Sequence, residues 1–415
     1  MKRVVNASSS SIYDDDPSLP KREDSRGQAG PVCLSGDGQA TDLKRYLQYL
    51  RDPFYWRRAL LRLTEVVTRP MHLETVMDQV MRDNWSLGEL AASSQTGLPA
   101  AGARLLYIAP TFDYGNPARG YSYEENHFLP SLVALGFHVI RLDSLSLVKR
   151  LGTRGASELL TEVTHRFRPQ VSFSVLFKDD FEAEAVEALK RAGCVSVNWF
   201  TDDHWRFETF SSRWAPRFSW AVTTDRAAIP KYHARGITSV IRSQWGVNHR
   251  LYRPLDRIRR YDVTFIGQPH GDRRAVIARL RRAGLRVDTW GYGWPGGKTT
   301  TRQAVEIISE SAVNLNLSNA VTGRTDQVKG RDFEVPASRG LLLTRRVPGM
   351  EEYFELGTEI LTYETVEDLE RQIRRVLADP AEADRVRDAG YRRTIRDHTY
   401  ERRFMEIFQT IGVFS

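Results

Sequence analysis

Strand and helix patterns alternate along most of this chain, and this alternation constrains the fold more than any other feature. From Arg104 onward, short apolar runs rich in β-branched residues are separated by amphipathic stretches with helical spacing. The first set of expected strands covers 105–109, 139–142, 171–176, 195–198, 221–223 and 240–242. The expected helices between them cover 124–135, 156–167, 181–192 and 226–235. Such alternation is typical of a parallel sheet with helices on both faces.

The alternation stops and then restarts, which indicates two domains. Gly246 and Pro254 lie in a segment, residues 245–256, that we interpret as a linker. The second set of expected strands covers 263–266, 287–290, 313–317, 341–344 and 360–363. The expected helices of this half cover 273–283, 302–310, 332–338, 366–378, 381–396 and 400–411. The sequence therefore predicts an α/β protein with two tandem Rossmann-like, doubly wound domains, in which ligands bind beyond the C-terminal ends of the strands.

The residues before Arg104 have a different character. Residues 1–40 are rich in Ser, Asp and Gly and are expected to form a disordered tail. Residues 41–102 are expected to form a helical extension, because apolar residues recur at helical spacing. The N-terminus lacks the apolar core of a secretory signal, and no apolar stretch approaches the roughly 20 residues that span a bilayer. A cytoplasmic protein without a transmembrane segment is the expectation.

Composition excludes several classes of protein. The net charge of +8 comes from 60 basic and 52 acidic residues, and the basic ones, mostly Arg, are spread over every segment. No helix-turn-helix, zinc-finger or RNP-like signature accompanies them, so no nucleic-acid partner is expected. The 2 cysteines are far apart and match no zinc-ligand spacing. The pattern Asp14–Asp16 lies in the expected tail, which supplies no rigid shell for ligands, so no metal site is expected.

The most informative segment for function is 326–340. Lys329 and Arg331 immediately precede an expected short helix, and Gly330 lets the backbone approach a ligand closely. Two cations beside a helix N-terminus make a site for a diphosphate. Glu334, in the first helical turn, has the geometry to accept hydrogen bonds from two adjacent hydroxyls, such as those of a ribose. A purely structural interpretation also fits, with Asp332 as an N-cap and Glu334 as a surface residue.

This segment also resembles a known family. The run Lys-Gly-Arg-Asp-Phe-Glu at 329–334, then Pro336-Ala337 and the run Gly-Leu-Leu-Leu-Thr at 340–344, is similar to the donor-site block of spore-maturation-protein-type bacterial glycosyltransferases. The resemblance continues in 348–354, 359–363, 389–390 and 398–400, and in the first half in 113–116, 119–124 and 198–203. It covers about residues 103–412. These enzymes belong to the group 1 glycosyltransferases of the GT-B fold.

The resemblance implies a division of labour between the domains. Residues 103–247 correspond to an acceptor domain and 248–396 to a nucleotide-sugar donor domain, while the helix within 397–415 crosses back to the first domain. Simple packing of that helix on its own domain is the alternative. The family has two acids eight positions apart, which fall on Glu334 and on Asp326, where Glu is usual. The resemblance further places donor contacts on the following residues: Gly267, Arg273, Gly291 and Asn316. A plain turn or strand-end residue is the alternative interpretation of each.

An acceptor hydroxyl must lose a proton during sugar transfer. The candidates for the base are Asp202, Asp203 and His204, which follow an expected strand at the edge where clefts form. A capping cluster is the alternative interpretation of these three. Asp113, Gly115 and Arg119 are expected on the acceptor side, in a loop after the first strand, with Glu125 nearby on the next helix. His127 on that helix is interpreted as a packing residue.

The sequence thus predicts a metal-independent glycosyltransferase without a cofactor. It transfers a sugar from a nucleotide-diphosphate donor, by default a UDP-sugar, to a hydroxyl of a glycan, surface polymer or small molecule. Lys329 and Arg331 stabilise the negative charge that develops on the departing diphosphate. A nucleotide-sugar epimerase of the same fold and a non-catalytic glycan- or surface-binding protein are the alternatives. The donor sugar, the acceptor, the stereochemistry and the oligomeric state are left open.

Overall fold

The structure is a computed structural model that describes residues 76–77, 80, 100–318 and 327–414. The expected tail at 1–40 lies outside the described residues, and so does nearly all of the helical extension. Val76 and Met77 are described; they are helical and buried against the first domain.

The first domain is built on a six-stranded parallel sheet with the order β2-β1-β3-β4-β5-β6. Its strands are β1 (Arg104–Ile108), β2 (His138–Leu142), β3 (Val171–Ser174), β4 (Val195–Phe200), β5 (Trp220–Thr223) and β6 (Val240–Arg242). The main covering helices are α4 (Tyr123–Ala134), α5 (Ser144–Phe167), α6 (Ala183–Arg191) and α9 (Ala228–Ala234). Alternate residues of β1 point into two different apolar clusters, so both faces of the sheet are buried.

The second domain has a five-stranded parallel sheet with the order β11-β10-β9-β7-β8. Its strands are β7 (Tyr261–Ile266), β8 (Val287–Trp290), β9 (Ser311–Asn316), β10 (Leu342–Arg345) and β11 (Leu361–Tyr363). Its helices are α10 (Arg273–Arg282), α11 (Thr301–Ser309), α12 (Arg331–Ala337), α13 (Val366–Ala378) and α14 (Pro380–Asp397). Two parallel α/β sheets in tandem are the predicted fold class.

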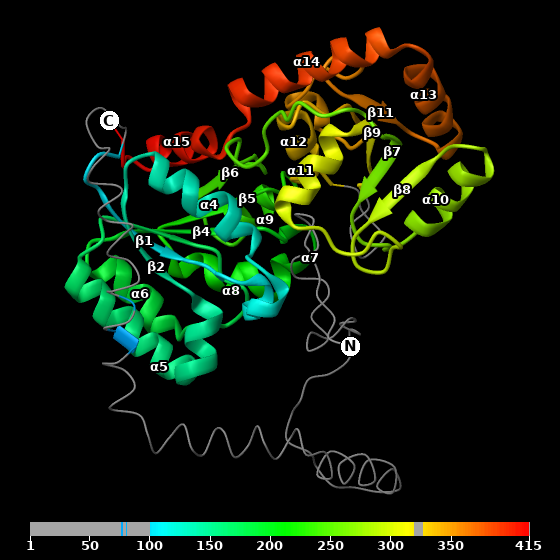
Figure 1. Cartoon of the computed structure of the whole chain (residues 1–415). Helices are drawn as coiled ribbons and strands as arrows, with labels where there is room; N and C mark the ends of the chain where they lie inside the picture. The colour runs from blue at the N-terminus through cyan, green and yellow to red at the C-terminus, as the bar shows by residue number, and fades with distance from the viewer. Residues whose placement is uncertain (1–75, 78–79, 81–99, 319–326, 415) are drawn as a thin grey trace, which may run out of the picture.

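The last helix, α15 (Tyr400–Thr410), leaves the second domain and packs on the first, next to α4 (Figure 1). Its apolar stripe is aromatic. Phe404 contacts the ring of Phe128 with centroids 5.5 Å apart, and Phe408 contacts that of Phe137 at 4.9 Å. The Tyr400 hydroxyl lies 2.7 Å from that of Tyr123 at the start of α4. The chain therefore connects the domains twice, through the segment before β7 and through α15.

Two features of the first domain differ from the expected pattern. Helix α5 begins twelve residues earlier than expected, at Ser144, because Gly152 with a φ of 69° lets the chain bend and continue. The stretch after β4 is helical rather than a plain loop. It consists of α7 (Asp203–Arg206), a π-helical turn η3 (Phe207–Ser211), α8 (Ser212–Trp214) and the 3-10 turn η4 (Ala215–Arg217). Within the described residues, no helix is both long enough and apolar enough to span a bilayer.

Candidate active site

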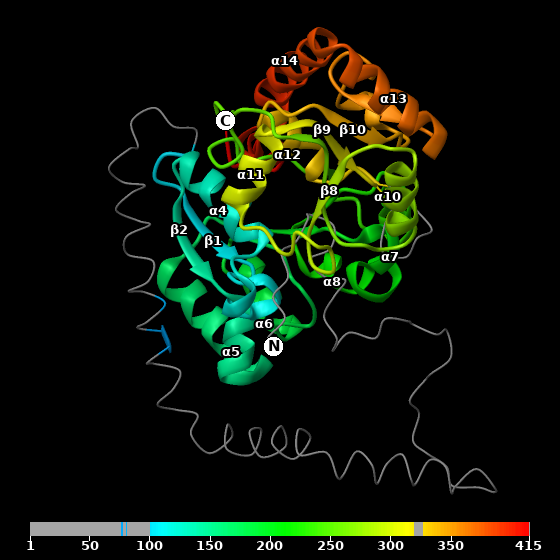
Figure 2. The ribbon, with the colours of Figure 1, turned by 45° about the vertical axis from the view of Figure 1, so that its right-hand side comes forward.

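A cavity lies between the two domains, where α4 faces α11 and α12. Figures 1 and 2 both show α11 next to α4. The volume of the cavity is about 40 Å³. The first domain and the linker contribute Tyr121, Tyr123, Asn126, His127 and Tyr252 to its wall. The second domain contributes Ile266, Gly267, Gly291, Thr299, Thr300, Thr301, Ala304, Arg331 and Glu334. Five of the residues in these two sets are named in the sequence analysis: His127, Gly267, Gly291 and the Arg331–Glu334 pair on α12.

The start of α12 is buried at this interdomain boundary. Lys329, Arg331 and Glu334 are exposed by only 2%, 5% and 2%. The Nη1 atom of Arg331 lies 3.0 Å from Oε2 of Glu334. Neither atom is in a hydrogen bond within the described part of the chain, because the two groups are close but poorly aligned. A buried ion pair with unused hydrogen-bonding capacity is a place where a polar ligand can bind.

Glu334 also contacts the other domain. Its Oε1 atom lies 3.5 Å from Nε2 of His127 on α4. The Tyr252 hydroxyl from the linker hydrogen-bonds to the carboxylate and also interacts with Arg331. Burial raises the pKa of Glu334, whereas the Arg331 charge and the Tyr252 hydrogen bond act in the opposite direction. The carboxylate predicted to hold a ribose is therefore linked to three separate segments of the chain.

Asp332 and Asn316 have a structural function. The Asp332 carboxylate accepts from the backbone N–H of Lys329 at 2.9 Å, from Asn316 Nδ2 at 2.6 Å and from Thr344 Oγ1 at 2.9 Å. These bonds tie the loop before α12 to the ends of β9 and β10. Asn316 was expected to contact the donor; here its side chain holds the Lys329 loop in place through Asp332.

The loops after β7 and β8 meet at two glycines. Gly291 has a φ of 121°, and a Cβ atom built on it would lie 2.1 Å from the backbone oxygen of Gly267. Both glycines line the cavity. Arg273, expected as a phosphate contact, opens α10 and is buried. Its Nη1 donates to the backbone oxygen of Gln268 at 2.9 Å and its Nη2 to that of Leu317 at 2.7 Å. It therefore fixes two strand-end loops against each other.

The close approach at Gly291 gives a direct test. Gly291→Ala is expected to destabilise the protein by more than about 2 kcal/mol, because the methyl group meets backbone atoms that have no alternative position. Gly284→Ala is the matched control. It shares a positive φ of 83° but has no atom within 4 Å of the added Cβ, so the expected cost is about 1 kcal/mol. Urea denaturation measures both, and equal losses would show that the contact with Gly267 is unimportant.

The three candidate bases after β4, Asp202, Asp203 and His204, have different surroundings. Asp203 is fully buried, and its Oδ2 accepts from the Tyr232 hydroxyl at 2.8 Å inside the first domain. It does not face the cleft, so it cannot reach an acceptor hydroxyl there. Burial lowers the pKa of His204. The positive charge of Lys329, in the second domain, lowers this pKa as well, so the two side chains lie near each other. His204 therefore lies near the second domain, and Asp202, two positions before it, stays a candidate.

Burial raises the pKa of Asp203 to about 6 from an ordinary 3.8. The folded state therefore keeps a proton that the unfolded state has lost, and folding loses stability as the pH rises through this interval. Asp203→Asn does not titrate. We therefore compare the free energies of unfolding of the variant and the original protein. The difference between them is expected to shift by about 3 kcal/mol in favour of the variant from pH 3 to pH 8. Parallel pH–stability curves for the two proteins would contradict this interpretation of the Asp203 environment.

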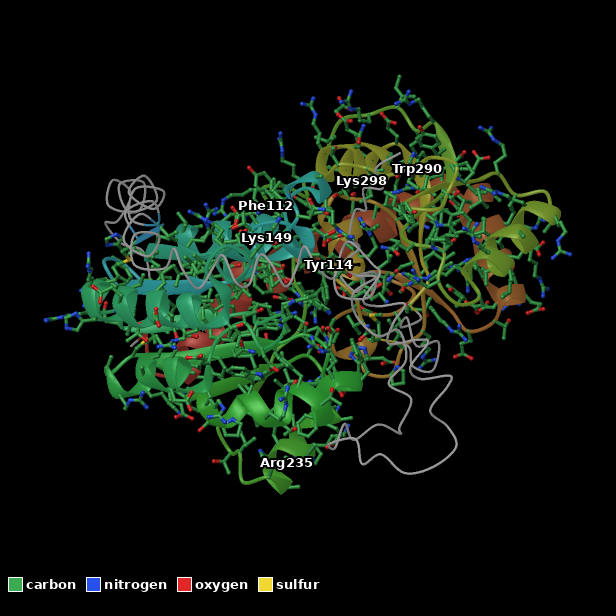
Figure 3. The ribbon with its side chains drawn as sticks, turned by 90° about the horizontal axis from the view of Figure 1, so that it is seen from below. Phe112, Tyr114, Lys149, Arg235, Trp290 and Lys298 are labelled. Atoms are coloured by element: carbon green, nitrogen blue, oxygen red, sulfur yellow. The ribbon has the colours of Figure 1, made fainter. Side chains whose placement is uncertain are left out.

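The predicted acceptor-side loop lies across the cleft from the second domain. Asp113 is buried and its Oδ2 lies 2.9 Å from Nε of Arg119, which also stacks over the Tyr114 ring at 4.1 Å. Lys298 of the second domain donates to the backbone oxygen of Arg119 at 2.9 Å. Figure 3 shows Lys298 beside the loop that carries Phe112 and Tyr114. The pair Asp113 and Arg119 thus lies next to Lys298 of the second domain.

Two other predicted acceptor-side residues have different surroundings. Gly115 has a φ of 65°, and its Cα faces Leu145 at the start of α5. Glu125 forms an ion pair with Arg141 of β2, with 2.5 Å between the charged atoms, and does not line the cavity. Asp326, the first acid of the predicted pair, lies outside the described residues.

Sequence reasoning missed several cavity residues. Tyr252 was placed in a linker, and Thr299–Thr301 precede a helix without any motif to mark them. His127 was interpreted as a packing residue, and its contact with Glu334 depends on how the domains meet. Only Tyr252 carried a usable signal, as an aromatic residue within a polar linker.

Comparison with known proteins agrees with this geometry. Residues 272–409 match the family model described as "Glycosyl transferase-like". No curated protein matches the chain. Among solved structures, sucrose-phosphate synthase from Thermosynechococcus elongatus is 14% identical with a TM-score of 0.52, and the match covers 75% of this chain and 98% of that chain. A glycosyltransferase from Rickettsia africae is 12% identical with a TM-score of 0.50, covering 75% and 98%. Anabaena HepE, solved with UDP and glucose, is 12% identical with a TM-score of 0.50, covering 75% and 99%.

The structural matches and the two tandem sheets together show the fold of the protein. The chain has the GT-B fold, and its residues 272–409 are similar to the glycosyl transferase-like family.

Proposed function

We propose that this protein is a glycosyltransferase of the group 1 type, which binds a nucleotide-diphosphate sugar against the second domain and transfers the sugar to a hydroxyl group on an acceptor at the first domain. The observation that carries the proposal is the burial of Arg331 and Glu334 in the wall of an interdomain cavity, with the buried Lys329 two residues before Arg331. The family resemblance and the UDP complex of HepE support a UDP-sugar as the donor. The resemblance in 329–344 also favours the spore-maturation type within the group.

The proposed chemistry follows from the charges. As the bond between the anomeric carbon and the diphosphate oxygen breaks, negative charge grows on the leaving diphosphate. Lys329 is already buried, with its backbone held by Asp332, and it stabilises this charge together with Arg331. Glu334 accepts hydrogen bonds from the ribose hydroxyls, using the capacity that its Oε2 atom leaves open. Arg331 turns from Glu334 toward the diphosphate when the nucleotide enters.

The acceptor hydroxyl loses its proton to a base after β4. Burial, and secondarily Lys329, lower the pKa of His204, so its imidazole is neutral at pH 7 and able to accept a proton. Asp202, one position before α7, is the second candidate. Its Oδ2 atom is buried and makes no hydrogen bond within the described part of the chain. Asp113 and Arg119 bind the acceptor from the opposite side of the cleft mouth.

Calorimetric titration with UDP, GDP, ADP and dTDP tests the proposal. One of these nucleotides is expected to bind, and Glu334→Gln is expected to weaken its binding strongly. Incubation with the matching nucleotide sugar then separates the reaction classes. Release of nucleotide diphosphate that speeds up with an acceptor supports transfer, whereas an isomerised donor without release indicates an epimerase. Absence of binding by all four nucleotides would contradict the proposed function.

A further inference from the structure

His127 is a histidine that the proposed chemistry does not use, although it lies against the proposed ribose site. It is exposed by only 2%. Its Nδ1 atom accepts from the backbone N–H of Asn248 at 3.3 Å. The ring proton must therefore be on Nε2, the atom that lies 3.5 Å from Oε1 of Glu334. Nε2–H is thus a donor directed at the carboxylate.

The imidazole ring is held firmly in this orientation. It stacks on Tyr123 with centroids 4.0 Å apart and on Tyr252 with centroids 5.4 Å apart. The Asn248 side chain donates to the backbone oxygen of Asn126 at 2.7 Å, which fixes the linker to α4. The ring also has an edge contact with Tyr400, with centroids 5.6 Å apart, and its second nitrogen, Nε2, lies toward Glu334 of α12.

The charge state of His127 suits a donor. Burial, and secondarily the nearby Arg331, lower its pKa to about 3. The ring is neutral near pH 7, so it orients the Glu334 carboxylate without cancelling its negative charge. An oriented, still anionic carboxylate is what two ribose hydroxyls require as an acceptor. The distance of 3.5 Å is long for a hydrogen bond, and such contacts often tighten in the complex with substrate.

We propose that His127 is a positioning residue for the nucleotide: by holding Oε1 of Glu334 it directs the rest of the carboxylate to the ribose hydroxyls. Because His127 belongs to the first domain and Glu334 to the second, the ribose site is complete only when α4 lies against α12. The inference rests on the proposed function, since it needs a nucleotide in the cavity.

Two amide variants separate this function from simple packing. The side-chain nitrogen of His127→Gln reaches the place of Nε2, whereas that of His127→Asn reaches only the place of Nδ1. Calorimetric titration measures the affinity of each variant for UDP and for 2′,3′-dideoxy-UDP, which lacks the ribose hydroxyls. If another nucleoside diphosphate binds more tightly than UDP, the titrations use that nucleotide and its 2′,3′-dideoxy analogue instead. His127→Asn is expected to lose about tenfold in affinity for UDP, the usual effect of one hydrogen bond. His127→Gln is expected to stay within about threefold of the original protein.

The dideoxy nucleotide decides the outcome. Its affinity is expected to be the same for the original protein and for His127→Asn within about twofold, because no hydroxyl is left for Glu334 to hold. Equal losses for both nucleotides would overturn the inference and assign His127 to holding the domains together. Unchanged UDP affinity in His127→Asn would overturn it as well. If the original protein binds no nucleotide diphosphate, the proposed function fails first and the inference fails with it.

Discussion

Glu334→Ala is expected to lower the free energy of unfolding by about 3–5 kcal/mol, the largest stability effect in this protein that we predict. Removal of the carboxylate leaves the Arg331 guanidinium buried without a counter-charge, at 5% exposure. It also removes the partner of Tyr252 and of His127. Urea denaturation monitored by circular dichroism measures the loss.

A double variant separates this effect from nucleotide binding. Replacing both members of the pair, Arg331→Met with Glu334→Leu, removes the uncompensated charge, so most of the lost stability is expected to return. Nucleotide binding is expected to remain absent, because the groups that contact the ribose and the diphosphate are both gone. A double variant as unstable as Glu334→Ala would show that the pair does not behave as a buried ion pair.

Lys329→Met is expected to reduce the rate of sugar transfer by a factor of about 10²–10³, the second large effect. Met preserves the length and apolar stem of Lys329 and removes only the ammonium charge. The backbone of this residue is held by Asp332, so the loop keeps its position. Release of nucleotide diphosphate from the donor measures the rate, and the melting temperature shows whether the variant is folded.

Lys190→Met is the matched control for the loss of one positive charge. Lys190 is exposed, and its Nζ donates to the backbone oxygen of Pro216, in the first domain. Its replacement is expected to leave the rate unchanged within about twofold. A Lys329→Met variant with the same rate as Lys190→Met would remove Lys329 from the proposed chemistry.

The fold followed closely from the sequence because each sheet is buried on both faces. Such strands form continuous apolar runs, and the expected strand at 240–242 agrees with β6 at both ends. Helix ends are marked by capping residues such as Ser122 and Thr300, which both accept from the third helical N–H. The sequence did not predict the helical turns after β4, because the local pattern at Asp202 and Asp203 also fits a helix cap or a loop.

The site was less predictable, since it depends on contacts between segments far apart in the sequence. The local pattern in 329–334 was sufficient to indicate that Lys329, Arg331 and Glu334 belong together. It was not sufficient to show that Arg331 pairs with Glu334 or that His127 approaches from the other domain. Asp203 shows the same limit, because only the tertiary structure reveals that Tyr232 holds its side chain inside the first domain.

A crystal structure of the protein with UDP tests the central claim most directly. We expect nucleotide in the cavity between α4, α11 and α12, with ribose oxygens at about 2.6–3.2 Å from the Glu334 carboxylate and diphosphate oxygens next to Lys329. Density for the nucleotide at any other place, with Glu334 still covered by Arg331 and Tyr252, would contradict it.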